Sequence, residues 1–189
     1  MKLVELLTER QGAVSERWLD AVLAEYGPVT AARWRREKDP FANPVGHSLA
    51  TGLPALVAAV ARDGELTDEA STALEEIVRV RSVQDMAPSR AVASVWLLRD
   101  AIRAELADAL AGGAHASELV GVDCRIEQLA LTAFDTYVEL REQVFRLRQE
   151  ELKRSVASIL RRWHGGEIPE AEARALTQLA PPRDPAVRR

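Results

Sequence analysis

Apolar residues along this chain recur at intervals of three and four, which is the period of an amphipathic α-helix. The strict alternation of apolar and polar residues that marks a half-buried strand is hard to find. The chain is also rich in Ala, Leu, Glu and Arg, which favour helices. The sequence therefore predicts an all-α fold. Glycine and proline positions divide it into expected helices at 2–26, 30–38, 44–62, 67–83, 88–110, 117–163 and 169–179, with a disordered tail at 181–189.

Local signals refine three of these helices. Thr30 and Thr67 are plausible N-caps, because a hydroxyl can accept a hydrogen bond from a free N–H of the first turn. Pro54 lies inside the third helix and removes a backbone hydrogen bond there, so a kink near residues 50–51 is expected.

The last main helix is unusually long. No Gly or Pro occurs between residues 122 and 163, and a helix of about 45 residues spans roughly 70 Å. A compact domain of this size is about 30–40 Å across, so part of the helix is expected to project, to bend or to pair with another chain. We expect one helical domain at 1–164 with this extended final helix, and a short helix and tail at 165–189.

Two apolar patterns follow each other along this helix. The first predicts a core-facing stripe of Ile126, Leu129, Ala133, Phe134, Tyr137 and Val138. The second is narrower, resembles a coiled-coil seam, and consists of Phe145, Leu152, Val156, Ile159 and Trp163. It indicates either a long core helix with a solvated end or, as we favour, parallel dimerisation. The candidate dimer and relay residues are Tyr137, Arg141, Val144, Phe145, Arg148, Leu152 and Ile159.

Composition narrows the function classes. Lys plus Arg total 25 and Asp plus Glu total 29, giving a formal net charge of −4, which argues against nucleic-acid binding. The single cysteine, Cys124, excludes an internal disulfide. Charges interrupt the apolar N-terminus, unlike a signal peptide, and the most apolar stretch, 53–61, is too short to cross a membrane. We expect a cytoplasmic protein without a transmembrane segment.

Catalytic and metal motifs are not found in the sequence. It has no Gly-rich phosphate loop, no Cys-x-x-Cys and no nucleophile elbow, and its three histidines are not spaced as helix-borne metal ligands. We therefore expect no enzyme and no metal. His47 suggests a capping or buried hydrogen bond, with ligand binding or proton sensing as the alternative, and Cys124 suggests a small buried residue.

One polar cluster stands out at the end of the 67–83 helix. It consists of Arg79, Arg81, Gln84 and Asp85. Arg81 and Asp85 are four residues apart and could pair along one helix face. A solvated or internally paired helix end is the alternative interpretation.

Three ordered motifs carry a family resemblance. They are Arg36-Glu-Lys-Asp-Pro-Phe-Ala-Asn-Pro-Val-Gly-His47, the run 77–85 followed by Pro88-Ser89, and the set Arg125-Ile126, 129–131, 133–135, Tyr137 and Arg141-Glu142. Together they resemble the RsbRD N-terminal domain, the sensor module of RsbT co-antagonist proteins. The resemblance covers about residues 15–160. Ala87 departs from it, because relatives tend to carry a Ser that would cap the next helix.

The resemblance implies a globin-like, all-helical sensor domain that forms dimers and, in related proteins, precedes a STAS output domain of the stressosome. Haem is not expected, because the 67–83 helix contains no His, Cys or Met, and no other cofactor is expected. About 25 residues follow Trp163, too few for such an output domain, so we expect action in trans on a protein partner. A constitutive adaptor or assembly subunit of a larger complex, such as a respiratory or sulfur-metabolism complex, is the alternative. The candidate ligand or signal cluster is Asn43, His47, Arg81, Gln84, Asp85, Arg125 and Asp135.

Overall fold

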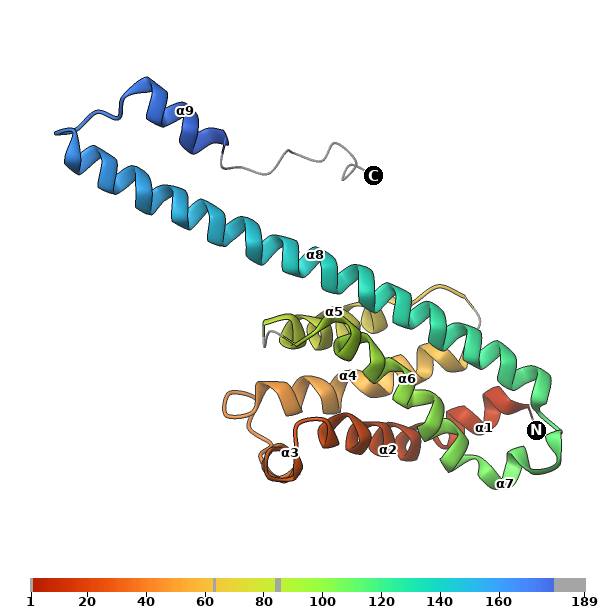
Figure 1. The fold of residues 1–189 in the computed structure, drawn as a ribbon. Helices are drawn as coiled ribbons and strands as arrows, with labels where there is room; N and C mark the ends of the chain where they lie inside the picture. Colours follow the sequence, from red (N-terminus) through yellow and green to blue (C-terminus); the bar gives the residue numbers. More distant parts are fainter. Residues whose placement is uncertain (1, 63, 84–85, 179–189) are drawn as a thin grey trace. The chain divides into compact units, whose positions relative to one another are not determined.

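The computed structural model describes residues 2–62, 64–83 and 86–178, and every regular element in these ranges is a helix (Figure 1). The prediction of an all-α chain with a long C-terminal helix is confirmed. The elements are α1 (Leu3–Glu9), α2 (Gln11–Ala24), α3 (Pro28–Arg36), α4 (Pro44–Ala61), α5 (Asp68–Val83), α6 (Pro88–Glu105), α7 (Ala107–Leu110), the 3-10 turn η1 (Ala111–Gly113), α8 (Ala116–Trp163) and α9 (Glu170–Gln178). The predicted tail at 181–189 lies outside the described residues.

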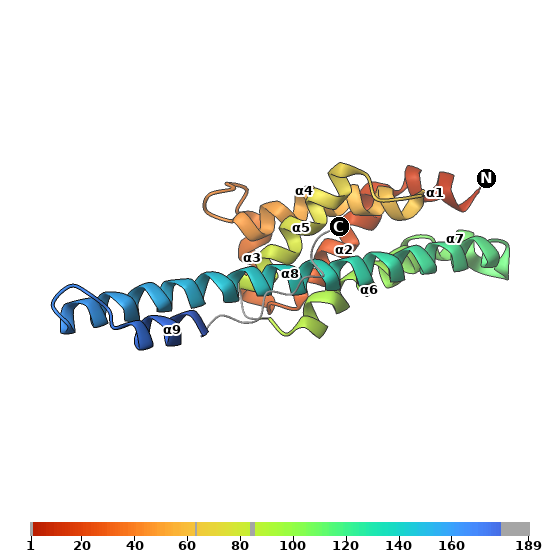
Figure 2. The same cartoon turned by 90° about the horizontal axis from the view of Figure 1, so that it is seen from above.

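The chain divides into two compact units, residues 1–140 and 141–189. In the first unit α2 packs against α4 and α6, and α4 packs against α5, as two perpendicular views show (Figures 1 and 2). A single apolar core joins α1, α2, α4, α5, α6 and the first part of α8. Burial of these three- and four-spaced residues is the main source of the bundle's stability.

The predicted helix 2–26 is two helices, α1 and α2, which meet at Arg10. Each buries its own stripe: Leu3 and Leu7 from α1, and Trp18 from α2. The indole Nε1 of Trp18 donates a hydrogen bond to the Ser94 carbonyl oxygen (2.8 Å). The break therefore lets two short apolar faces reach different parts of one core, which the sequence period alone does not reveal.

Local residues explain where α5 and α3 begin. Thr67 caps α5, since its Oγ1 accepts from the backbone N of Ala70 (3.2 Å), so that prediction is confirmed. The Thr30 cap is wrong: α3 begins at Pro28, after Gly27 with φ +83°. A positive φ suits glycine and turns the chain sharply before the helix, and Pro is pre-organised for a first helical position.

α4 is the one helix in the described ranges that is long and apolar enough to cross a membrane, with a mean hydropathy of 1.4 over 18 residues. It continues past Pro54, whose carbonyl oxygen accepts from Gln11 Nε2 (2.8 Å). Leu49, Leu53 and Leu56 of this helix lie in the core. Length and composition of this kind also occur in the central helix of a soluble bundle, and α4 packs as such a helix here.

The first part of α8 buries one stripe in the first unit. Ile126, Leu129 and Tyr137 are buried, as predicted. Phe134 and Val138 are 45% and 38% exposed, so their prediction as core residues is wrong. At about 100° per residue, they lie roughly a quarter to a third of a turn from the centre of the buried stripe. Cys124, expected to be buried, is also exposed.

The second unit contains the rest of α8 and α9, which lies beside the last turns of α8 in both views (Figures 1 and 2). His164 Nε2 is 3.2 Å from Glu172 Oε2, which joins the end of α8 to α9. Val156 of the predicted seam is half-buried, whereas Leu152 and Ile159 are 62% and 59% exposed. The predicted seam therefore contains a half-buried position, Val156, and exposed positions, among them Leu152 and Ile159.

Candidate functional site

A buried arginine lies at the end of α5 in the first unit. Arg81 is 1% exposed, and its Nη1 donates a hydrogen bond to Glu25 Oε2 on the residue after α2 (3.2 Å). The guanidinium carbon is 5.7 Å from the centre of the Tyr26 ring, and Nη1 is 3.6 Å from Met86 Sδ. Glu25, Tyr26, Arg81, Met86 and Tyr137, which joins them as described below, form the Arg81 cluster.

The register of α5 explains why this arginine is buried. Leu74, Ile77 and Val78 face the core, and Arg81 follows them by seven, four and three residues, so it shares their helix face. Burial of a guanidinium costs free energy unless its donors are paired. Among the described residues Nη1 alone finds a partner, since Nε and Nη2 of Arg81 and the hydroxyl of Tyr26 are buried without hydrogen-bond partners there.

The space beside the Arg81 guanidinium is narrow, with essentially no volume for a water-sized molecule. Its walls are Tyr26, Val45, Ser48, Leu49, Ile77, Val80 and Arg81. A buried donor left unpaired costs about 1–3 kcal/mol, and more when it belongs to a charged group. Among the described residues, the Arg81 cluster therefore contains buried donors that carry this cost.

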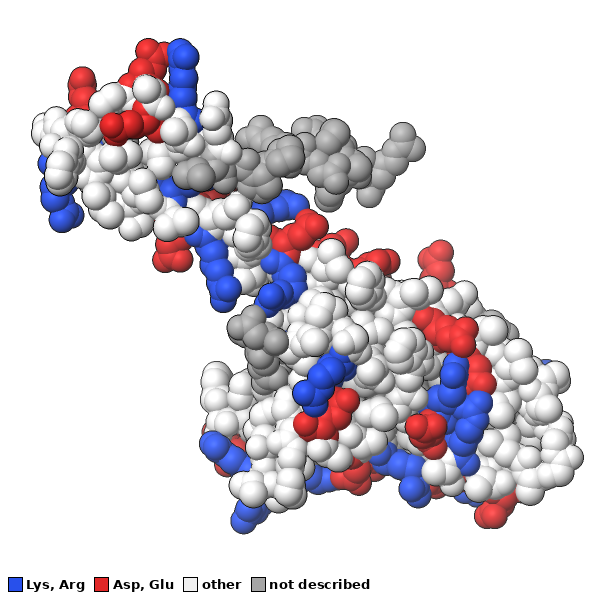
Figure 3. Space-filling view, in the orientation of Figure 1, with Lys and Arg blue, Asp and Glu red and all other residues white. Residues whose placement is uncertain are grey.

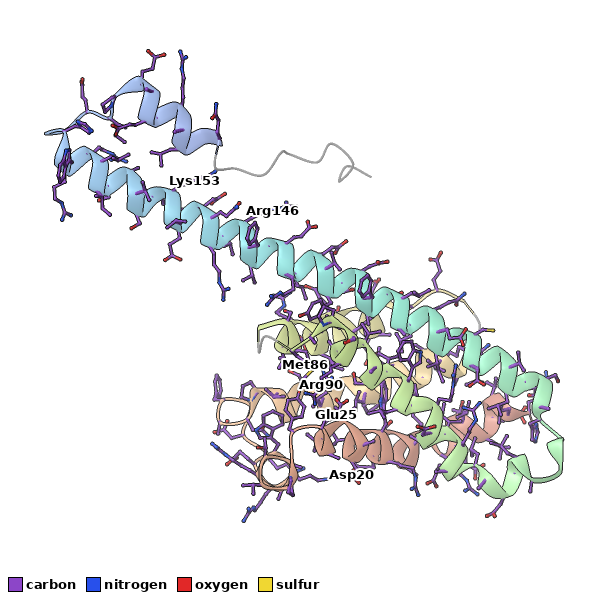
Figure 4. All side chains as sticks on the ribbon, viewed as in Figure 1. Asp20, Glu25, Met86, Arg90, Arg146 and Lys153 are labelled. Atoms are coloured by element: carbon purple, nitrogen blue, oxygen red, sulfur yellow. The ribbon has the colours of Figure 1, made fainter. Side chains whose placement is uncertain are left out.

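Burial and nearby charges shift the pKa of the Tyr26 hydroxyl. Burial raises the pKa of the Tyr26 hydroxyl above its usual value of 10.0, the charge of Arg81 lowers it, Glu25 raises it and Arg90 lowers it again. Figure 4 shows Glu25, Met86 and Arg90 in the same region of the first unit. They come from the end of α2, the turn before α6, and α6 itself.

The cluster reaches the long helix through Met86. The hydroxyl of Tyr137 on α8 donates a hydrogen bond to the Met86 carbonyl oxygen (2.5 Å), and the Met86 sulfur touches Arg81. One residue of the α5–α6 turn thus contacts both the buried arginine and the long helix. A change in the position of Arg81 would act directly on a contact that holds α8.

The predicted Asn43 and His47 lie elsewhere, at the α3–α4 junction. Asn43 is buried, its Oδ1 accepts from Gly46 N (2.9 Å), and its Nδ2 donates to the carbonyl oxygens of Trp34 (2.8 Å) and Glu37 (2.9 Å). These bonds account for all the polar groups of its side chain. His47 is exposed and lines a hollow of about 50 Å³ between α2, α3 and α4.

The other predicted residues are also dispersed. Arg125 on α8 donates from Nε to the Val60 carbonyl oxygen near the end of α4 (2.6 Å), and Asp135 is exposed. Gln84 and Asp85 lie outside the described residues, and so does the predicted Arg81–Asp85 pair. Of the five predicted cluster residues that the structure describes, Arg81 alone therefore belongs to the Arg81 cluster. Arg79 is exposed and pairs with Glu75 on its own helix.

Three cluster members, Glu25, Tyr26 and Met86, were not predicted as site residues. Glu25 and Arg81 are 56 residues apart in the chain, a separation that helical periodicity does not address. Tyr26 matched the apolar period of the first helix, although its hydroxyl is the unusual feature. Met86 takes part through its backbone oxygen as well as its sulfur, and no side-chain pattern indicates a backbone contact.

Other surface features are less specific. The described residues hold no group of three or more His, Cys, Asp or Glu side chains able to bind a metal. Residues of α2 and α3 line an open hollow of about 370 Å³, and Arg35 beside it pairs with Glu16 and Asp20. Acidic and basic side chains are mixed on the face shown in Figure 3, without a broad field of one sign.

Comparison with known proteins gives one family. The sequence model described as "RsbT co-antagonist protein rsbRD N-terminal domain" matches residues 12–152. Neither the curated proteins nor the solved structures give a match. The globin-like arrangement that the resemblance implies therefore stays a prediction. The matched range contains all of the Arg81 cluster.

Proposed function

The chain belongs to the RsbT co-antagonist protein RsbRD N-terminal domain family, and we propose that it relays a signal as a homodimer to a protein partner in trans. The family consists of stressosome-type sensor domains. In this proposal the chain acts in the cytoplasm, without a catalytic step and without a cofactor. Its two finer parts, relay and dimerisation, are supported by different observations.

The Arg81 cluster carries the relay part. We infer that its donors without partners among the described residues favour a second arrangement in which they find acceptors. A sensor needs such an element with two arrangements, because a stimulus can shift only an equilibrium that already exists. Met86 links Arg81 to Tyr137 on α8, so the two arrangements would hold α8 differently.

The uncovered apolar side chains of α8 support the dimer. Phe145, Leu152 and Ile159 are spaced by seven residues and are each more than half exposed. A seven-residue apolar repeat on a helix is typical of a surface that packs against another helix. We propose that a second copy of this chain covers it.

Two matched leucines test this surface. Leu152 and Leu147 are both on α8 and are 62% and 65% exposed, but Leu147 is outside the repeat. We expect Leu152→Asp to weaken dimerisation at least about tenfold, because it places a charge in an apolar contact, and Leu147→Asp to leave it nearly unchanged. Sedimentation equilibrium measures both. A monomeric parent chain, or equal effects of the two variants, would reject the dimer surface.

Two matched arginines test the relay. Arg81→Met removes the unpaired donors, whereas Arg79→Met changes an exposed arginine of the same helix. If the Arg81 cluster is coupled to α8, Arg81→Met should change the dimer dissociation constant by about tenfold, which corresponds to an ordinary coupling free energy. Arg79→Met should not. A dimer that is indifferent to both substitutions would instead favour a constitutive assembly subunit.

A further inference from the structure

One edge of the buried Arg81 guanidinium is without a hydrogen-bond acceptor among the described residues. Nη1 donates to Glu25, whereas Nε and Nη2 have no partner there. These two nitrogens share one edge of the planar group, and their N–H bonds point in parallel. Such a fork matches the two oxygens of a single carboxylate, which it can bind with two hydrogen bonds.

Tyr26 adds a donor to the same place. Tyr26 and Arg81 both line the narrow hollow between the end of α2, α4 and α5, and the Tyr26 hydroxyl is buried without a partner in the described part of the chain. Burial raises the pKa of this hydroxyl above 10.0, so it stays protonated at neutral pH and can donate to an oxygen anion. Two side chains from different elements therefore offer donors to one hollow.

The charges around the hollow fit one negative charge. Among the described residues, the groups whose charges act on Tyr26 are Arg81, Arg90 and Glu25, and Figure 4 shows Glu25 and Arg90 in the same region. The cations exceed the anion by one charge, so a single monovalent anion would leave the group neutral. A dianion such as sulfate would bring an excess negative charge into a partly buried site, which costs free energy.

The rim of the hollow can open by side-chain rotation. Leu49, Ile77 and Arg81 are its buried walls. The other walls are half-buried, namely Tyr26, Val45, Ser48 and Val80. Partly exposed side chains change rotamer within about nanoseconds, so a small molecule can reach the guanidinium while the helices keep their places.

We propose that the Arg81 cluster binds a small monocarboxylate, whose two oxygens accept hydrogen bonds from Nε and Nη2 of Arg81 and one of them also from the Tyr26 hydroxyl. The valine, leucine and isoleucine walls of the hollow suit a short alkyl chain on that carboxylate. Because the hollow as described has essentially no volume for a water-sized molecule, the ligand selects the arrangement with the rim rotated and shifts the equilibrium towards it.

Binding would act on the long helix through Met86. Its sulfur lies 3.6 Å from Nη1 of Arg81, and its carbonyl oxygen accepts from Tyr137. A guanidinium held by a carboxylate on its other edge therefore changes a contact that reaches α8. This names the stimulus of the relay proposed above and, as a stimulus, rests on that relay.

Propionate is the probe for the first test. Saturation-transfer NMR on the full chain, at neutral pH and constant ionic strength, should show saturable binding of one propionate per chain. Propionamide has the same shape without the charge and should bind at least about tenfold more weakly. Sulfate at equal concentration should not displace propionate. No saturable propionate signal, equal binding of propionamide, or displacement by sulfate would overturn the carboxylate site.

Matched variants locate the binding. Arg81→Lys keeps a cation but offers a single point in place of the fork, so propionate should bind at least about tenfold more weakly, and Tyr26→Phe should weaken it about fivefold. Arg79→Lys, on the exposed side of the same helix, should leave it unchanged. Circular dichroism checks that each variant is folded, and Arg81→Met, which leaves no charge at position 81, replaces Arg81→Lys if the lysine unfolds the chain. Unaltered binding to the folded Arg81 variant would place propionate elsewhere and reject the site.

Sedimentation equilibrium separates this inference from the relay. Saturating propionate should change the dimer dissociation constant of the parent by about tenfold, and it should leave that of Arg81→Met unchanged. If propionate does not bind but Arg81→Met still alters the dimer, the carboxylate site is wrong and the relay stands. If propionate binds at Arg81 and the dimer is indifferent to it, the site stands and its role as the stimulus is rejected.

Discussion

The hydroxyl of Tyr137 and the carbonyl oxygen of Met86 lie 2.5 Å apart, joining the long helix to the turn between α5 and α6. Met86 also touches the buried Arg81 through its sulfur. The bond therefore connects the residue beside the buried Arg81 with the helix that carries the uncovered apolar positions. Its loss is the most direct way to test how firmly the first unit holds α8.

Replacing Tyr137 by Phe should destabilise the chain. The substitution keeps the buried ring but leaves the Met86 carbonyl oxygen without this donor, at an expected cost of about 1–3 kcal/mol in the free energy of unfolding. Urea denaturation followed by circular dichroism measures it. Thr132→Ala, at an exposed position of the same helix, should stay within about 0.5 kcal/mol. Equal effects of the two variants would show that the bond contributes nothing specific.

The same substitution at Tyr26, the other tyrosine, should have the opposite sign. Its hydroxyl is buried without a partner in the described part of the chain, while its ring centre lies 4.7 Å from that of Trp34 and the ring lies beside Arg81. Tyr26→Phe keeps both ring contacts and removes an unpaired polar group, so the free energy of unfolding should rise by about 1 kcal/mol. The same urea titration applies. A clear loss of stability would mean that the hydroxyl has an acceptor in solution.

What the sequence could and could not predict follows from distance along the chain. The Thr67 cap and the long uninterrupted α8 were predicted correctly, because a hydroxyl three residues from an N–H and a run without Gly or Pro are local facts. The burial of Arg81 follows from its helix register, yet its partner Glu25 is 56 residues away. The break at Arg10 and the exposure of Phe134 depend on which faces the bundle covers. Only the assembled fold determines that.

The Arg81–Glu25 pair should respond unequally to loss of either member. Arg81 is 1% exposed, whereas the Glu25 side chain is 21% exposed. Glu25→Gln leaves a buried cation without its anion and should lower the free energy of unfolding by about 2 kcal/mol or more. Arg81→Met leaves a carboxylate that can reach water and replaces a poorly paired cation with an apolar side chain, so its cost should be about 1 kcal/mol or less.

The double variant completes this prediction. With Met at position 81 no buried cation remains, so adding Glu25→Gln should cost almost nothing further, and the double variant should unfold like Arg81→Met. Chemical denaturation of all four proteins gives the coupling free energy of the pair. Additive costs would indicate that the two side chains do not interact, contrary to the 3.2 Å contact.

Acid should reveal the contact between α1 and α8. Glu118 accepts hydrogen bonds from His115 (3.0 Å) and from the backbone N of Leu3 (2.8 Å), and these lower the pKa of its carboxyl. A carboxyl whose pKa is lower in the folded state stabilises the fold above its unfolded pKa, and that contribution is lost as the pH falls through the folded value. Glu118→Gln should therefore be less stable than the parent at pH 5.5, and the difference should shrink below about pH 4.3. Unfolding free energies between pH 5.5 and 3 measure this, with Glu139→Gln at an exposed position of α8 as the matched control. A difference that stays constant down to pH 3 would show that the charge of Glu118 does not hold α1 to α8.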